Sequence, residues 1–263
     1  MDALMHRMGL HGKAVVPFIL GYGCNVPAVM STRMLEDRRD RYLAAALATL
    51  VPCAARLAVV FGLVAFYLGP IAALSIYLFN LLVIAFTGRV ISGLLPEDTP
   101  GMILEMPVYR LPTFRTVIQK TWFRAREFVV EAWPILIVGS IVLAVIIYLN
   151  LAPVVNLLVL PLTWSLGLPN EVGVPLMFGI LRKELSLIML RQALGVSDFG
   201  AVLTPVQMIT FSVFVVFYVP CLATLAVINR ELGKRATLSI AGLTVLIATI
   251  AALVARVVAS IRY

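Results

Sequence analysis

Long apolar stretches, several of them interrupted by proline or glycine, are the feature that most constrains this chain. A helix needs about 20 apolar residues to cross the hydrocarbon core of a bilayer. Runs of this length occupy residues 42–68, 70–92, 130–150, 205–229 and 236–261. Because backbone N–H and C=O groups must be satisfied internally in lipid, such runs become transmembrane helices. The sequence therefore predicts an all-α polytopic transmembrane helical bundle.

The composition agrees with a membrane protein and excludes two other classes. Of the 263 residues, 62% are hydrophobic and 13% are charged. An average soluble domain has about 45–50% apolar and about 25% charged residues. A soluble fold would therefore lack the polar side chains to cover its surface, and disorder requires low hydrophobicity with high net charge. We expect a multi-pass protein of the cell membrane, with the lipid bilayer as its surroundings.

The net charge of +8 is concentrated in short segments between the apolar runs. Basic residues gather at 32–41, 110–126 and 230–235, and the positive-inside rule places such segments in the cytoplasm. This distribution explains the charge without nucleic acid as a partner. The three cysteines are an odd number and lie in or beside apolar stretches, so no disulfide framework is predicted.

Three further apolar stretches leave the topology open. Residues 14–30 either cross from outside to inside or dip into the membrane and return. Residues 153–166 are short and bounded by proline, which fits a re-entrant or tilted half-helix better than a crossing. If residues 153–166 do cross, four spans lie between the basic segments 110–126 and 230–235. These spans are 130–150, 153–166, 171–195 and 205–229. An even number of crossings keeps both segments on the cytoplasmic side.

The middle of the chain differs from the spans around it. Apolar side chains with Trp122 recur at helical spacing over residues 113–129, with basic residues on the other faces. Such a helix lies flat in the headgroup region or caps the bundle. We divide the chain into a first repeat at 1–93, incomplete at its N-terminus, a proline-rich loop and interfacial amphipathic helix at 94–129, and a second repeat with terminal spans at 130–263.

Two short motifs recur in the same order in both halves. VPFILG at 16–21 resembles VPLMFG at 174–179, and VPCAA at 51–55 resembles VPCLA at 219–223. By the expected topology the two units enter the membrane from opposite sides, which is the inverted repeat of many transporters. Proline and glycine inside the units predict broken or re-entrant helices whose freed backbone groups bind an ion or substrate. The alternative is a kink that serves packing alone.

The candidate ligands lie at these helix breaks. A cysteine thiol is a soft ligand for Fe, Cu or Zn, although it is also an ordinary small core residue. The proposed metal-binding residues are Cys24, Cys53, Cys221, Asn25 and Glu184. The proposed pore and gating residues are Gly21, Gly23, Pro27, Pro52, Pro220, Arg182 and Lys183.

Three adjacent charges, Arg182, Lys183 and Glu184, interrupt the apolar stretch 171–195. Charged side chains inside a membrane are costly and face a cavity or a partner. Glu184 is the acidic candidate for a cation path. The alternative is an internal ion pair with Arg182, Lys183 or Arg56.

No motif for enzymatic chemistry is found. Residues 7–14 faintly resemble a phosphate-binding loop, but Arg7 stands where the first glycine is needed and Ala14 has no hydroxyl for magnesium. Ser-His-Asp arrangements, zinc spacings and paired carboxylates are likewise not recognisable. We therefore expect no enzymatic activity and no permanently bound cofactor.

The motifs resemble the membrane region of the ferrous iron transport protein B (FeoB) family. The resemblance rests on GYGCNVPA at 21–28, VPC at 51–53, EMPVYRLP at 105–112, GILRKE at 179–184, LTP at 203–205 and YVPCLATL at 218–225. It implies a cytoplasmic-membrane importer of Fe²⁺ with two gate repeats. It also implies that Cys24, Cys53 and Cys221 line the iron path.

This sequence departs from the family pattern at its start, because the GTPase domain and the first membrane span are absent. Gating by GTP would then require a separate GTPase domain or subunit, and a homo-oligomer is left open as a further partner. Two alternatives to a permease module for Fe²⁺ remain. One is a non-transporting scaffold or a truncated fragment of an iron transporter, and the other is a gate-family transporter for a nucleoside-like solute.

Overall fold

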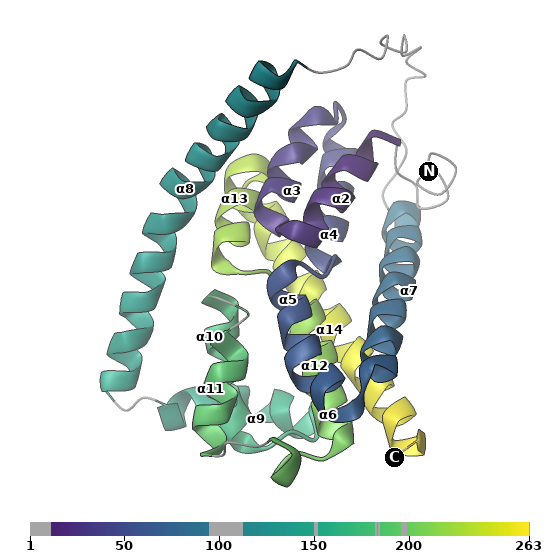
Figure 1. Ribbon diagram of the computed structural model, residues 1–263, viewed down its shortest axis with the longest axis vertical. Coiled ribbons are helices and arrows are strands. Elements are labelled where there is room, and N and C mark those ends of the chain that lie inside the picture. The colour runs from purple at the N-terminus through teal and green to yellow at the C-terminus, as the bar shows by residue number, and fades with distance from the viewer. Residues whose placement is uncertain are drawn as a thin grey trace.

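The computed structural model describes residues 12–94, 113–149, 152–181, 183, 185–195 and 199–262. The described part is helical and contains no strand, which confirms the all-α membrane fold. The helices are α2 (Val15–Gly23), α3 (Asn25–Ser31), α4 (Arg38–Leu50), α5 (Ala54–Val59), α6 (Phe66–Leu68), α7 (Pro70–Leu94), α8 (Phe114–Tyr148), α9 (Ala152–Leu166), α10 (Gly173–Leu181), α11 (Leu185–Leu194), α12 (Pro205–Phe217), α13 (Leu222–Leu232) and α14 (Lys234–Arg262), with a π-helical stretch at Val60–Ala65 (Figure 1).

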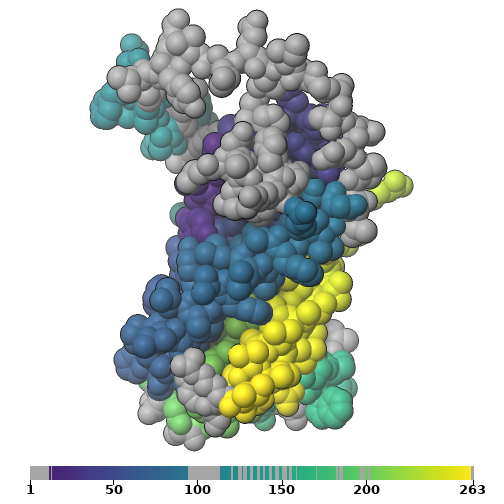
Figure 2. Space-filling model, turned by 90° about the vertical axis from the view of Figure 1, so that its right-hand side faces the viewer, coloured from purple at the N-terminus to yellow at the C-terminus, as the bar shows by residue number. Residues whose placement is uncertain are grey.

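Four stretches of the described chain are long and apolar enough to cross a membrane. Two of them, Arg38–Leu68 and Pro205–Leu232, contain helix breaks, and 61% and 72% of their most apolar windows are buried. The other two, Pro70–Gly93 and Lys234–Ile261, are unbroken helices with only 33% and 28% buried. The broken spans therefore form the centre of the bundle, and α7 and α14 cover one outer face, which Figure 2 shows in blue and yellow.

The core is built around α12, because this helix is buried on nearly every side. Its residues 210–217 are all buried, and Phe211, Phe214 and Phe217 are among the largest fully buried side chains. A helix that is apolar all round is a core helix or a membrane span, and α12 is a core helix that forms the first part of the broken span Pro205–Leu232. The α5 segment packs against α12, and α13 packs against α3.

The first apolar stretch dips into the bundle and returns. Helices α2 and α3 pack against each other as a hairpin that enters from the upper end of the molecule (Figure 1). Helices α10 and α11 form a second hairpin, which enters from the lower end (Figure 1). The full crossing expected at 171–195 is therefore wrong, since two helices of 9 and 10 residues are too short to cross singly.

Each half of the chain thus contains a hairpin followed by a broken span. The broken spans run in opposite directions, with α4 and α5 descending and α12 and α13 ascending (Figure 1). This arrangement has the form of the predicted inverted repeat. The boundaries proposed between the repeats stay predictions.

The expected separate amphipathic helix at 113–129 is the first half of one long helix. Helix α8 continues without interruption from Phe114 to Tyr148 and contains Pro134. The proline is tolerated because helices in membranes can satisfy the freed backbone group by local adjustment. The proline-rich loop at 95–112, with its EMPVYRLP motif, lies outside the described residues.

Helix α9, at residues 152–166, lies across the lower end of the bundle and does not cross it (Figure 1). Helix α8 descends from the upper to the lower end of the molecule and the α12–α13 span returns, so the basic segments near 114 and 230 lie at the same end (Figure 1). The basic segments reach the same upper end, where Arg33 pairs with Glu231 and Arg41 lies 3.6 Å from the same carboxylate. Their cytoplasmic side stays a prediction.

Candidate functional site at the helix breaks

Three helix breaks bring extended backbone into the middle of the bundle. Cys24 alone separates α2 from α3, with φ −152° and ψ 135°. Pro52 breaks the α4–α5 span, because the residue before a proline is pushed out of the helical region and Val51 is extended. The α12–α13 span is interrupted between Tyr218, which is also extended, and Cys221, and Pro220 lies in this break. Pro27 causes no break, since it occupies the first turn of α3, where a missing N–H is tolerated.

The three cysteines occupy equivalent positions relative to their helices. Cys24, Cys53 and Cys221 are each the residue at which the helix resumes after a break, at the N-caps of α3, α5 and α13. All three thiols are free and partly buried. Cys24 and Cys221, which come from opposite halves of the chain, also pack against the same buried apolar cluster of α3, α4 and α13.

These thiols do not form a preassembled metal centre. In the part of the chain that the structure describes, no three His, Cys, Asp or Glu side chains are close enough to hold one ion. Glu184 and Arg182 lie outside the described residues. The Cys221 thiol is 3.1 Å from the Thr224 hydroxyl.

Arg56 lies in the same region and is fully buried. Its guanidinium donates to the carbonyl oxygens of Thr49 and Val51 at the break of its own span. It also donates to the carbonyl oxygen of Tyr218, at 3.3 Å, across the interface between the two halves. Helix ends leave carbonyl groups without partners, and Arg56 satisfies such groups in both broken spans.

Lys183 reaches the second break from the α10–α11 hairpin. Its ammonium donates to the carbonyl oxygens of Val215 and Tyr218 at 3.1 and 3.2 Å and lies 3.9 Å from the centroid of the Tyr218 ring. The Tyr218 hydroxyl donates to the Leu176 carbonyl at 2.7 Å. Among the described residues neither Lys183 nor Arg56 pairs with a carboxylate. The alternative pairing of these cations with Glu184 is not tested, because Glu184 lies outside the described residues.

Two asparagine side chains border the first break. Asn25 and Asn80 donate through Nδ2, both at 3.3 Å, to the carbonyl oxygens of Thr49 and Leu50 in the last turn of α4. Both side chains are buried, and neither Oδ1 has a hydrogen-bond partner. Sequence reasoning missed Asn80, although a lone amide in the middle of an apolar span is a recognisable signal.

The repeat glycines pack against the broken spans. A Cβ on Gly21 would lie 3.2 Å from the Val51 Cβ, and a Cβ on Gly179 would overlap the Tyr218 hydroxyl. In each half the last glycine of the VPxxxG motif thus lets a hairpin approach its break closely. A Cβ on Gly23 would meet nothing within 4 Å, so packing does not require a glycine there.

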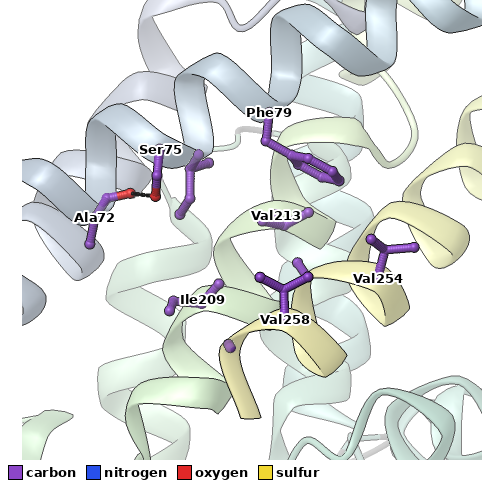
Figure 3. A pocket seen from close by; sticks show the side chains of 10 residues that line it. Ala72, Ser75, Phe79, Ile209, Val213, Val254 and Val258 are labelled. Carbon is purple, nitrogen blue, oxygen red and sulfur yellow. Dashed lines mark hydrogen bonds between the residues drawn. The ribbon is translucent and has the colours of Figure 1, made fainter. Parts of the chain in front are cut away.

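Two apolar cavities are lined by residues that the structure describes, and the larger one lies beside the Pro52 break. The larger, about 440 Å³, is lined by Pro52, Tyr77, Asn80 and apolar neighbours of α5, α7 and α12. The smaller, about 170 Å³, lies between α7, α12 and α14, and its one hydroxyl, on Ser75, already donates to the Ala72 carbonyl (Figure 3). Linings of this kind offer a cation almost no ligands, so the breaks themselves are the better candidate site.

Comparison with known families and proteins gives matches over the whole of this chain. The family described as ferrous iron transport protein B C terminus matches residues 73–124. The Gate family, described as nucleoside recognition, matches residues 1–67 and 129–235. The match to the Gate family therefore includes all three helix breaks and all three cysteines.

Curated relatives match over most or all of this chain. The Fe(2+) transporter FeoB of Methanocaldococcus jannaschii is 31% identical over the whole chain, which covers 44% of that relative. Those of Synechocystis and Staphylococcus aureus strain COL are 33% and 29% identical, over 94% and 88% of this chain and 44% and 38% of their own lengths. The chain thus spans less than half of these relatives. No solved structure matches it.

Proposed function

Because this chain belongs to the FeoB family, as its membrane region, we propose that it is a permease module that carries Fe²⁺ across the cell membrane. The relatives named above are Fe²⁺ transporters, and the chain corresponds to part of each. Four helices of membrane-spanning length and composition support a multi-pass location.

The observation that carries the proposal is that three free cysteines each occupy the N-cap that follows a helix break. Thiols are soft ligands, so they bind Fe²⁺ better than they bind hard cations such as Mg²⁺ or Ca²⁺. In the proposed path Cys24, Cys53 and Cys221 bind the ion in passage, and the unpaired Oδ1 of Asn25 replaces part of its water shell. Glu184 would add a carboxylate beside Lys183.

The breaks also provide the proposed gate. Each of the three breaks separates two short helices, and these helices can move relative to each other. The breaks lie at Cys24, Pro52 and Pro220. Gly21 allows α2 to lie against the first break. The energy for opening would come from a GTPase domain or subunit, because no nucleotide-binding motif is found in this sequence.

The test is uptake of radioactive Fe²⁺, under reducing conditions, into liposomes that contain the purified chain. The variant replaces Cys24, Cys53 and Cys221 with serine, and the control Met208→Leu removes a buried sulfur at the start of α12. We expect uptake to fall about tenfold or more in the triple variant, since each lost ligand weakens the stabilisation of the dehydrated ion. Uptake should stay near the unsubstituted level in Met208→Leu.

Equal uptake by the triple variant and the unsubstituted chain would remove the cysteines from the mechanism. If neither transports iron, a separate GTPase is added before the assay is repeated, and continued failure would favour a non-transporting scaffold. The match to a family described as nucleoside recognition supplies the other alternative. Uptake of a radioactive nucleoside by the same liposomes, without uptake of iron, would favour that function.

A further inference from the structure

Lys183 is a buried cation whose surroundings are those of a bound ion. Lys183 is only 3% exposed. The carbonyl oxygens of Val215 and Tyr218 and the Tyr218 ring surround its ammonium. Carbonyl oxygens in irregular membrane segments coordinate cations in transporters and channels, and an aromatic face attracts cations further.

The carbonyl oxygens around Lys183 are free to accept its hydrogen bonds because the α12–α13 span is broken. Val215 and Tyr218 lie in and directly after the last turn of α12, where carbonyl groups lose their helical partners. The Tyr218 ring is held in place by the hydrogen bond from its hydroxyl to the Leu176 carbonyl. The site is therefore built from α12 and α10, and Lys183 adds a donor from the turn between α10 and α11.

A second cation competes for the same oxygen. Arg56 donates to the Tyr218 carbonyl as well, so the two cationic groups meet at one oxygen. Arg56 also satisfies carbonyls at the first break, so the pair lies at the breaks that carry Cys53 and Cys221. Like charges this close repel strongly in a medium of low dielectric constant. A divalent cation that reaches these cysteines adds further repulsion, which is relieved when Lys183 withdraws.

We propose that the carbonyl oxygens of Val215 and Tyr218, with the Tyr218 ring, form a cation-binding site that Lys183 fills while the path is closed. The transported cation enters this site when Lys183 leaves it. The exchange replaces one cation with another on the same oxygens, so the broken helix end stays satisfied throughout. The inference rests on the proposed function for the identity of the cargo, but the site itself can be tested without iron transport.

The experiment uses the full chain in liposomes and measures how fast a maleimide labels Cys221, which follows Tyr218 closely and is identified by mass spectrometry. We expect Lys183→Ala to raise the labelling rate about fivefold, because the emptied site loosens the break. Methylammonium, which restores a small cation with N–H donors, should return the rate to within about twofold of the unsubstituted chain. Tetramethylammonium carries the same charge without a donor and should not.

Two further variants serve as controls. Lys183→Arg keeps a cation and should label slowly, and Lys234→Ala removes a lysine at the start of α14 and should change nothing. A purely structural role for Lys183 predicts faster labelling in Lys183→Ala that methylammonium does not reverse, and that result would overturn the proposal. An unchanged labelling rate in Lys183→Ala would overturn it as well.

A measurement on the unsubstituted chain keeps the proposal testable if Lys183→Ala does not fold. Reductive methylation of Lys183 is compared with and without Fe²⁺ kept reduced by ascorbate, with Lys234 as the internal reference. Displacement by the cargo predicts a rise of about threefold in Lys183 modification alone, and equal modification contradicts the exchange. If methylammonium restores slow Cys221 labelling in Lys183→Ala but the chain transports no iron, the cation site is supported and the proposed function is not.

Discussion

Replacing Gly179 with alanine tests whether the second hairpin must approach the broken span as closely as the structure shows. The added Cβ would overlap the Tyr218 hydroxyl and lie 3.2 Å from the Ser186 Cβ. The hydroxyl must then move and lose its 2.7 Å hydrogen bond to the Leu176 carbonyl. An unsatisfied buried polar group costs about 1–3 kcal/mol, and overpacking costs a similar amount.

We therefore expect Gly179→Ala to destabilise the fold by about 4 kcal/mol, the middle of the combined range of about 2–6 kcal/mol. For a chain of this size that corresponds to a fall of about 10 °C in the apparent Tm. The three free, partly buried cysteines provide the assay, because a dye that fluoresces on reaction with thiols reports unfolding in detergent. Gly242→Ala is the matched control, since a Cβ there meets nothing within 4 Å.

A double-mutant cycle makes the test specific. Tyr218→Phe removes the oxygen that the new Cβ would meet, so Gly179→Ala should cost about 1 kcal/mol or less in that background. The control Gly242→Ala should leave the apparent Tm unchanged or raise it slightly, because alanine favours helix. If Gly179→Ala costs the same with Tyr218 and with phenylalanine at that position, the close contact does not explain the glycine.

Three other substitutions give sharp expectations from the same thermal assay. Arg56→Met leaves three buried carbonyls without their donor and should cost about 3–5 kcal/mol, which a stability equal to that of the unsubstituted chain would contradict. Asn156→Ala removes the side-chain oxygen that accepts the Val174 N–H at the start of α10 and should cost about 1 kcal/mol, whereas Asn156→Asp, which keeps an acceptor, should cost less. Glu231→Gln removes the carboxylate that pairs with Arg33 and should cost about 1 kcal/mol at low salt and less at high salt; a loss that does not depend on salt would refute the ionic explanation.

Sequence patterns predicted the composition of the bundle and the position of its breaks. Length and hydropathy identify membrane spans because a bilayer has a fixed thickness. Pro52 and Pro220 predict breaks because proline acts on its own backbone and on the preceding residue, whatever surrounds them. For the same local reason, the cysteines next to these prolines can be assigned to the breaks from their position in the chain.

Whether a stretch crosses or turns back could not be predicted in this way. Residues 171–195 have the length of a span, yet α10 and α11 form a hairpin, and Gly179 lets α10 lie close to Tyr218 at the end of α12. Residues 153–166 have a weaker apolar pattern and lie across the end of the bundle. Pro134 lies near the start of the span expected at 130–150, but α8 passes through it without a break.

The sequence by itself determined that this chain forms membrane helices, that two of them break at Pro52 and Pro220, and that Cys53 and Cys221 lie at these breaks, because each of these properties depends on neighbours along the chain. Only the tertiary structure decided which carbonyl groups the buried cations satisfy. Arg56 and Lys183 come from different halves and meet at one oxygen of Tyr218. That meeting depends on how two hairpins and two broken spans pack, and no local pattern in the sequence encodes it.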